Sequence, residues 1–156
     1  MTPDYIDILD DLVIVGTATR TSLQTAPTDI PALWQTFMQQ DLVNSLPRRS
    51  DDASIYAVYC DYESDFSGPY TMVLGVAVDA HAAVPAHTRR ARIPRGQFAS
   101  FRAEGDPRQI IWQTWQHINE RWDRRADRRY IADFERYAPE SAGGDSVKAD
   151  VVVGLG

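Results

Sequence analysis

The feature that most constrains the fold is an order of predicted elements that occurs twice along the chain. In the first half, a stretch rich in β-branched residues over 12–23 predicts a strand, and apolar residues at helical spacing predict a helix near 30–46. Two more strands follow in "SIYAVYCDYES" and "YTMVLGVAVD", joined by the turn-forming "DFSGP". The first half therefore has the order strand, helix, strand, strand.

The second half repeats this order after a linker of small residues and prolines. "RARIPRGQFASFRAEG" carries a strand, a helix is expected near 107–125, and "RYIADFERYAP" and "SVKADVVVGLG" are the last two strands, with a Gly143-Gly144 loop between them. Strands joined by short turns pair antiparallel, and helices between them must cover a face of the sheet. We therefore predict an α+β fold of duplicated β-α-β-β modules, with both helices on one face and a cleft between them.

The starts of the two predicted helices are similar. Thr28 or Asp29 can cap the first helix, with Pro31 in its first turn. Asp106 is expected to cap the second, with Pro107 at its first position.

Composition limits the class of protein. The 156 residues suit a single domain, 1–156, with modules at about 9–80 and 89–156. One cysteine excludes an internal disulfide framework and a multi-cysteine metal site, and no P-loop or dinucleotide-binding motif is present. We expect no metal and no cofactor.

Charge and hydropathy limit the partners and the compartment. The net charge of −6 disfavours general binding to nucleic acid or anionic membranes. No apolar run approaches the ~20 residues of a membrane span, and the acidic N-terminal residues lack the features of a secretory signal. A cytoplasmic location is expected. Five arginines between Arg121 and Arg129 are predicted to form a solvated, electrostatic helix end and not a nucleic-acid site.

The stretch "DFERYAP" raises the main functional question. Its alternation places Asp133, Glu135 and Tyr137 on one face of a strand, with Phe134 and Arg136 on the other. If the odd face meets water, Glu135 is an ordinary surface residue. If it faces a cavity, the strand holds a carboxylate there. The neighbouring residues leave both readings open.

The blocks "YAVYCDYESDFSGPYT" and "DFERY", the latter after a helix that contains "IIWQTWQHINERW", resemble the GyrI-like effector-binding superfamily. The resemblance runs from about residue 12 to residue 155 and is strongest to the stand-alone, integron-associated effector-binding proteins. It implies a pseudo-twofold pair of modules with an aromatic ligand cleft between the helices and a glutamate at the floor of the cleft. In multidrug-binding relatives that glutamate meets cationic, aromatic compounds.

Matching the motifs position by position gives six expected ligand-binding residues. The glutamate corresponds to Glu135 and the tryptophan of the second helix to Trp115. The resemblance places the other four in the lining: Trp34, Tyr59, Tyr70 and Tyr137. One departure is Phe98, which stands where a tyrosine is common in the family, so a hydroxyl is missing there.

Three functions compete under this resemblance. The first is a stand-alone protein that senses or sequesters cationic aromatic or amphipathic small molecules, with a separate regulator protein as a candidate partner. The second is hydrolysis of cyclopropane-bearing genotoxins, with Glu135 as general base and Tyr59 or Tyr137 as acid. The third is a protein-interaction role like that of gyrase-inhibiting relatives. The first is the function that we predict.

Overall fold

The computed structural model describes residues 1–142 and 144–156, so the predicted Gly143-Gly144 loop lies partly outside the described residues. It contains one eight-stranded antiparallel sheet with two main helices, which confirms the α+β prediction. The strands are β1 (Asp4–Ile8), β2 (Leu12–Thr21), β3 (Ile55–Cys60), β4 (Tyr70–Val78), β5 (Arg89–Ile93), β6 (Gly96–Gly105), β7 (Ala132–Tyr137) and β8 (Val147–Gly154). The helices are α1 (Ala26–Gln39), α2 (Leu42–Ser45), α3 (Pro107–Glu120) and the short 3₁₀ helix η1 (Arg125–Asp127).

The sheet order β1-β6-β8-β7-β3-β4-β2-β5 shows the twofold relation between the halves. From the central pair outward, β3, β4 and β2 follow one another on one side, and β7, β8 and β6 on the other. At the edges the halves exchange strands, because β1 pairs with β6 and β5 pairs with β2. The module limits of about 9–80 and 89–156 remain a prediction.

Two edge strands differ from the sequence prediction. The acidic start, for which the sequence predicted no strand, forms β1. The single strand expected before the second helix is two strands, β5 and β6, separated by Pro94 and Arg95. Strand β1 pairs only with residues 96–100, far along the chain, so no local hairpin signal marks it. Its pattern is also weak, because the five-residue edge strand DYIDI contains two aspartates and no regular alternation of polar and apolar residues.

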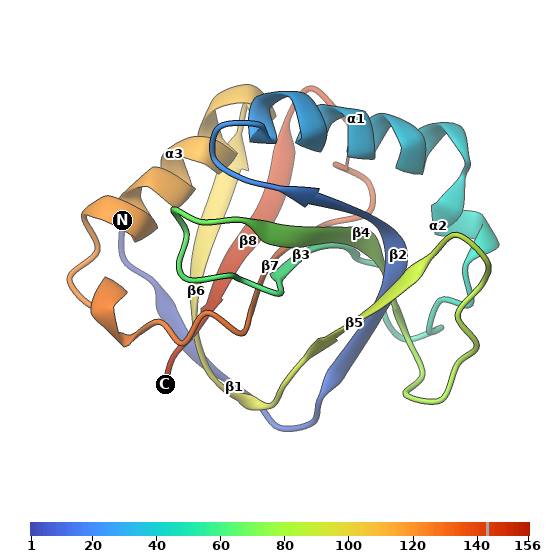
Figure 1. Cartoon of the computed structure of the whole chain (residues 1–156), viewed down its shortest axis with the longest axis horizontal. Coiled ribbons are helices and arrows are strands. Elements are labelled where there is room, and N and C mark those ends of the chain that lie inside the picture. Colours follow the sequence, from blue (N-terminus) through green and yellow to red (C-terminus); the bar gives the residue numbers. More distant parts are fainter. Residues whose placement is uncertain (143) are drawn as a thin grey trace.

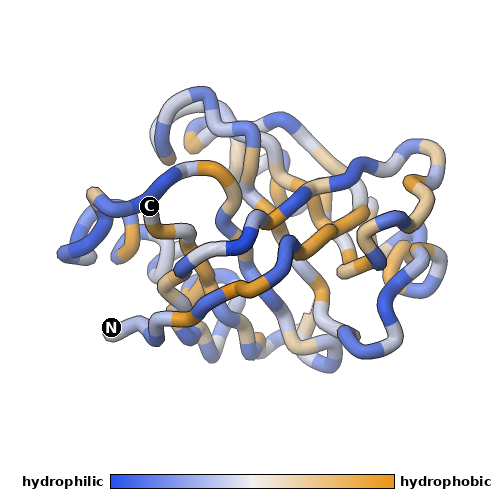
Figure 2. Tube along the Cα trace, turned by 90° about the horizontal axis from the view of Figure 1, so that it is seen from below, coloured by the Kyte–Doolittle hydropathy of each residue, from blue (hydrophilic) through white to orange (hydrophobic). Residues whose placement is uncertain are grey.

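Both helices lie on one face of the sheet, as predicted (Figure 1). Helix α1 buries Leu33 and Phe37 against this face, and α3 buries Ile118 there. The sheet curls away from the helices, and its other face encloses a second core around Tyr56 and Phe134. Seen from the side away from the helices, hydrophilic and hydrophobic residues alternate along the strands in front (Figure 2).

The first helix differs from its predicted bounds. It begins at Ala26 after Thr25, so neither Thr28 nor Asp29 caps it, and Pro27 occupies the first turn, where its missing N–H matters least. Pro31 lies inside the helix and leaves the carbonyl of Pro27 without the usual N–H partner. The helix expected to reach residue 46 ends at Gln39, because Asp41 adopts a left-handed backbone with φ of 49° before α2 begins.

The start of the second helix was predicted correctly, and its end was not. Asp106 caps α3 by accepting a hydrogen bond from the backbone N–H of Arg108 at 2.9 Å, and Pro107 follows it. Helix α3 ends at Glu120, about one turn and a half before residue 125. Among the described residues, no helix is long and apolar enough to cross a membrane.

Candidate functional site

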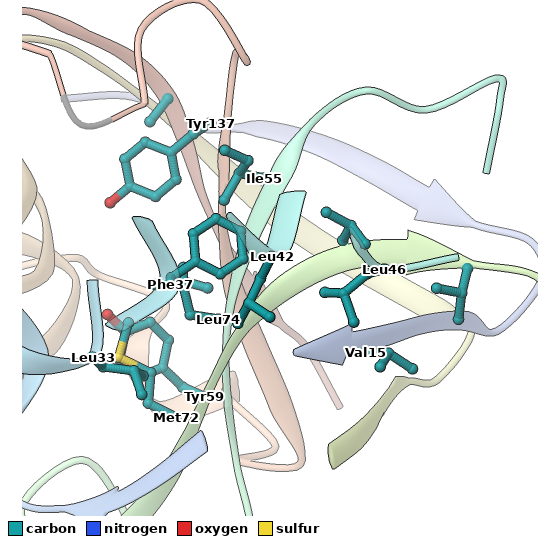
Figure 3. Close-up of a cluster of buried hydrophobic side chains, with 14 of the residues drawn as sticks. Val15, Leu33, Phe37, Leu42, Leu46, Ile55, Tyr59, Met72, Leu74 and Tyr137 are labelled. Carbon is teal, nitrogen blue, oxygen red and sulfur yellow. The ribbon is translucent and has the colours of Figure 1, made fainter. Parts of the chain in front are cut away.

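The central strand pair positions a glutamate between two tyrosines. In the register of β3 and β7, Ala57 lies opposite Glu135, Tyr59 opposite Asp133, and Ile55 opposite Tyr137. Side chains two residues apart share a face, so Tyr137 is the neighbour of Glu135 on the same strand, and Tyr59 lies diagonally across from Glu135 on β3. The small side chain of Ala57 leaves space for the carboxylate. The hydroxyl groups of Tyr59 and Tyr137 lie at the same side of the hydrophobic cluster (Figure 3).

The Glu135 carboxylate is buried, with 1% of the residue exposed, and accepts three hydrogen bonds. Its Oε2 accepts the Tyr59 hydroxyl at 2.6 Å and the Trp115 indole N–H at 2.6 Å, and its Oε1 accepts the Tyr137 hydroxyl at 2.5 Å. All three donors are uncharged. Among residues 1–142 and 144–156, no arginine or lysine forms an ion pair with Glu135.

Burial controls the ionisation of this group. Removal from water raises the pKa of Glu135 above its ordinary value, although the hydrogen bonds from Tyr137, Tyr59 and Trp115 oppose that rise. Burial, followed by the charge of Glu135, raises the pKa of Tyr59 and of Tyr137 well above the usual range. Both tyrosines therefore stay protonated and act as donors to the carboxylate.

The site opens into a cavity of about 910 Å³ between α1, α3 and the sheet. All six residues expected from the sequence line it: Trp34, Tyr59, Tyr70, Trp115, Glu135 and Tyr137. Their rings pack edge to face or tilted. The ring centroids are 5.0 Å apart for Trp34 and Tyr137, and 5.1 Å apart for Tyr59 and Trp115. The structure therefore brings the six together, and their role in binding remains a prediction.

The sequence did not reveal several other lining residues. Tyr62 and Phe66 come from the loop after β3, and Arg128 comes from the segment after η1. Trp112 and Asn119 belong to α3, where Trp112 lies one turn before Trp115 and is largely exposed. Trp112 was the one with a usable signal, since it lies beside the apolar stripe of its helix. Tyr62, Phe66 and Arg128 lie in loops, which carry no periodicity that could have placed them, and Asn119 is one of several polar residues near the end of α3.

The prediction that the arginine cluster is entirely surface is wrong for Arg128. Its side chain is 1% exposed and pairs with the fully buried carboxylate of Asp133 at 2.9 Å. Arg129 is also half-buried, with its guanidinium 5.0 Å from the centroid of the Phe98 ring. Both lie after α3 has ended, so the chain directs them back onto the sheet. Arg121 and Arg125 are exposed, as expected.

The missing hydroxyl at Phe98 has no effect on the cavity. Phe98 belongs to the core on the face away from the helices, where its ring centroid lies 6.0 Å from that of Phe134. A tyrosine hydroxyl at this position would lie behind the sheet and not among the cavity residues.

The charges around the cavity leave one carboxylate unbalanced. Among the described residues that line it, the ionisable side chains other than tyrosine are Glu135, Arg128 and Arg108. Arg128 is paired with Asp133, and Arg108 pairs with Asp106 at the exposed start of α3. The arrangement thus combines aromatic walls with a single buried carboxyl group that has no ion-pair partner among the described residues.

The sequence matches the family of integron-associated effector binding proteins, Cass2, over residues 6–153. The chain belongs to this family. Its sequence is also similar to that of YobU, a proposed transcriptional regulator protein of Bacillus subtilis (strain 168). The two are 30% identical over 155 residues, which covers 97% of this chain and 96% of YobU.

Solved structures show the same fold at low sequence identity. SAV2435 bound to tetraphenylphosphonium has a TM-score of 0.81 and 16% identity, and the match covers 100% of this chain and 94% of that protein. The integron cassette protein VCH_CASS2 from the mobile metagenome of Vibrio cholerae has a TM-score of 0.67 and 19% identity, with coverage of 98% and 96%. These likenesses support the fold assignment.

Proposed function

We propose that the protein binds cationic, aromatic small molecules in the cavity between α1 and α3, with Glu135 as the counter-charge. The observation that carries the proposal is the buried carboxylate, which has three neutral hydrogen-bond donors and no ion-pair partner among the described residues. An ionised group held out of water in this way is unfavourable until an opposite charge approaches it. A ligand cation supplies that charge.

The walls suit a delocalised, hydrophobic cation better than a small hydrated one. Trp34, Trp115 and Tyr59 present aromatic surface beside the carboxylate. A cation over such a ring gains about 0.5–2 kcal/mol for each contact. A metal ion or ammonium ion would have to exchange its hydration shell for these apolar walls, whereas a large organic cation is weakly hydrated.

The volume and the relatives support the same ligand class. About 910 Å³ lies near the upper end of the range typical of drug-sized ligands. The structural relative SAV2435 was solved with tetraphenylphosphonium, a large aromatic cation. The sequence relative YobU is named as a proposed transcriptional regulator. We propose that ligand binding here serves transcriptional regulation, with a separate regulator protein as the partner.

The test compares a cation with a neutral molecule of similar outline in the Glu135→Gln variant. Tetraphenylphosphonium and triphenylphosphine oxide are titrated by calorimetry into the wild-type protein and the variant. Glutamine keeps the shape of the side chain and removes the charge. Affinity for the phosphonium should fall about ten- to a hundredfold, the equivalent of ~1.5–3 kcal/mol for a charge-assisted contact, and affinity for the oxide should change little.

Trp34→Ala is the matched control. Trp34 lines the cavity and packs on Tyr137, but it makes no hydrogen bond to Glu135. Its loss removes aromatic area, so both ligands should weaken. Equal losses of the two ligands in Glu135→Gln, or no loss of either, would show that the carboxylate does not serve as the counter-charge.

A further inference from the structure

A second carboxylate lies beside Glu135 on the same strand. Asp133 precedes Glu135 by two residues in β7, so both side chains leave the same face of the sheet, with Cα atoms about 6.6 Å apart in an extended strand. Two carboxylates at this spacing could together hold a doubly charged ligand. The two carboxylates differ in their hydrogen-bond and ion-pair partners.

Asp133 is already neutralised by the protein. Its Oδ2 accepts Arg128 Nη2 at 2.9 Å and the Tyr62 hydroxyl at 2.7 Å, and its Oδ1 accepts the backbone N–H of Gly154 at 2.8 Å. Glu135 receives only neutral donors. The same strand face therefore carries one satisfied and one unsatisfied negative charge.

Arg128 is held in place from several sides. Its Nη1 donates to Asn119 Oδ1 at 2.5 Å, and its guanidinium lies 4.3 Å from the centroid of the Tyr130 ring and 5.7 Å from that of Trp115. Trp115 is the same indole that donates to Glu135. Arg128 and Asn119 both border the cavity. Trp115 therefore lies between the buried guanidinium of Arg128 and the Glu135 carboxylate, and contacts both.

We infer that Arg128 restricts the site to ligands with one positive charge, placed at the Glu135 end. This inference rests on the proposed function. A ligand cation can replace solvent beside Glu135. At the other end Arg128 lines the cavity whereas Asp133 does not, so a second positive charge would approach the guanidinium side of this ion pair. Repulsion between the buried guanidinium and a like charge of the ligand selects against the second charge. The part of the ligand that reaches Arg128 and Asn119 is therefore uncharged.

Two flat ligands of nearly equal outline provide the test. Para-phenyl-N-methylpyridinium carries one positive charge, and methyl viologen carries one at each end. Binding of both to the wild-type protein and to variants is measured by calorimetry at fixed ionic strength. The wild-type protein should prefer the monocation by about tenfold or more, because only the viologen places a charge against Arg128.

Three variants separate the role of Arg128 from general charge effects. Arg128→Gln leaves Asp133 unpaired and should reduce the preference about tenfold or reverse it. Because an unpaired buried carboxylate can prevent folding, the double variant Arg128→Gln/Asp133→Asn replaces the ion pair with a neutral pair. It should also lose most of the preference. Arg121→Gln removes the same charge from an exposed position outside the cavity and should keep the wild-type ratio.

The outcomes distinguish this inference from the proposed function. Equal binding of the two ligands to the wild-type protein would overturn the inference, as would an unchanged ratio in the double variant. If Glu135→Gln still weakens the monocation in those cases, the proposed function stands and only the role of Arg128 fails. If Glu135→Gln leaves the monocation unaffected, the proposed function itself fails.

Discussion

Removing the two tyrosine hydroxyls from Glu135 should destabilise the protein in a pH-dependent way. Tyr59→Phe and Tyr137→Phe keep the buried rings and delete one hydrogen bond each, at 2.6 and 2.5 Å to the carboxylate. A hydrogen bond to an ionised group is worth about 1.5–3 kcal/mol, and one to a neutral group about 0.5–1.5 kcal/mol. Each variant should therefore lose more stability when Glu135 is ionised than when it is protonated.

The direction of the pH effect follows from the raised pKa of Glu135. Since the folded protein holds this proton more tightly than the unfolded chain, the contribution of Glu135 to stability falls as pH rises from the unfolded pKa, about 4.3, through the raised folded pKa. The hydroxyls oppose this rise in pKa, so deleting one raises it further. The fall in stability of the variant should then extend to higher pH than that of the wild-type protein.

Urea denaturation followed by circular dichroism across pH 4–9 measures this effect as the difference between variant and wild type. The difference should grow by ~1 kcal/mol or more from the acid to the alkaline end of the series. Tyr70→Phe is the control, because Tyr70 lines the same cavity and its hydroxyl makes no hydrogen bond to another described residue. A constant difference for Tyr59→Phe and Tyr137→Phe, or a growing one for Tyr70→Phe, would refute the reasoning.

Two further predictions test the floor of the cavity and the arginine-rich segment. Ala57→Leu adds bulk at a fully buried position directly opposite Glu135. It should cost about 1–3 kcal/mol in urea denaturation and weaken tetraphenylphosphonium binding by displacing the carboxylate. For the arginines, duplex DNA should bind at physiological salt more weakly than ~10⁻⁶ M, because Arg128 and Arg129 are directed into the protein. Sub-micromolar, salt-sensitive binding in a filter or anisotropy assay would contradict this.

The strong local patterns in the sequence were enough to predict the fold class. Alternation in "DFERYAP" correctly placed Glu135 and Tyr137 on one face, and Asp106-Pro107 marked the start of α3. These signals act over a few residues, where side-chain period and capping chemistry decide the structure. The six lining residues, by contrast, came from a family resemblance. The alternation of β7 by itself left Glu135 facing either water or a cavity.

The sequence did not reveal the pairing of distant strands or the side-chain contacts made by irregular segments. Strand β1 depends on β6, and the buried position of Arg128 depends on Asp133, Asn119 and Tyr130 around it. An arginine that follows a helix has the same local sequence whether it ends in water or against a sheet. Whether Arg128 is exposed or buried depends on the path of the chain after η1, and no short-range sequence pattern indicates that path.

The twofold relation between the halves also explains why the site has one carboxylate. If the axis passes through the pair Ala57 and Glu135, it relates Tyr59 to Tyr137, each two residues further along its strand. The two halves thus contribute equivalent hydroxyls to one shared point on the axis. Only one half can place a carboxylate there without creating a pair of repelling charges, and the other half contributes the smallest side chain that makes room for it. The asymmetry between Ala57 and Glu135 is therefore what turns a nearly symmetric floor into a site with one carboxyl group.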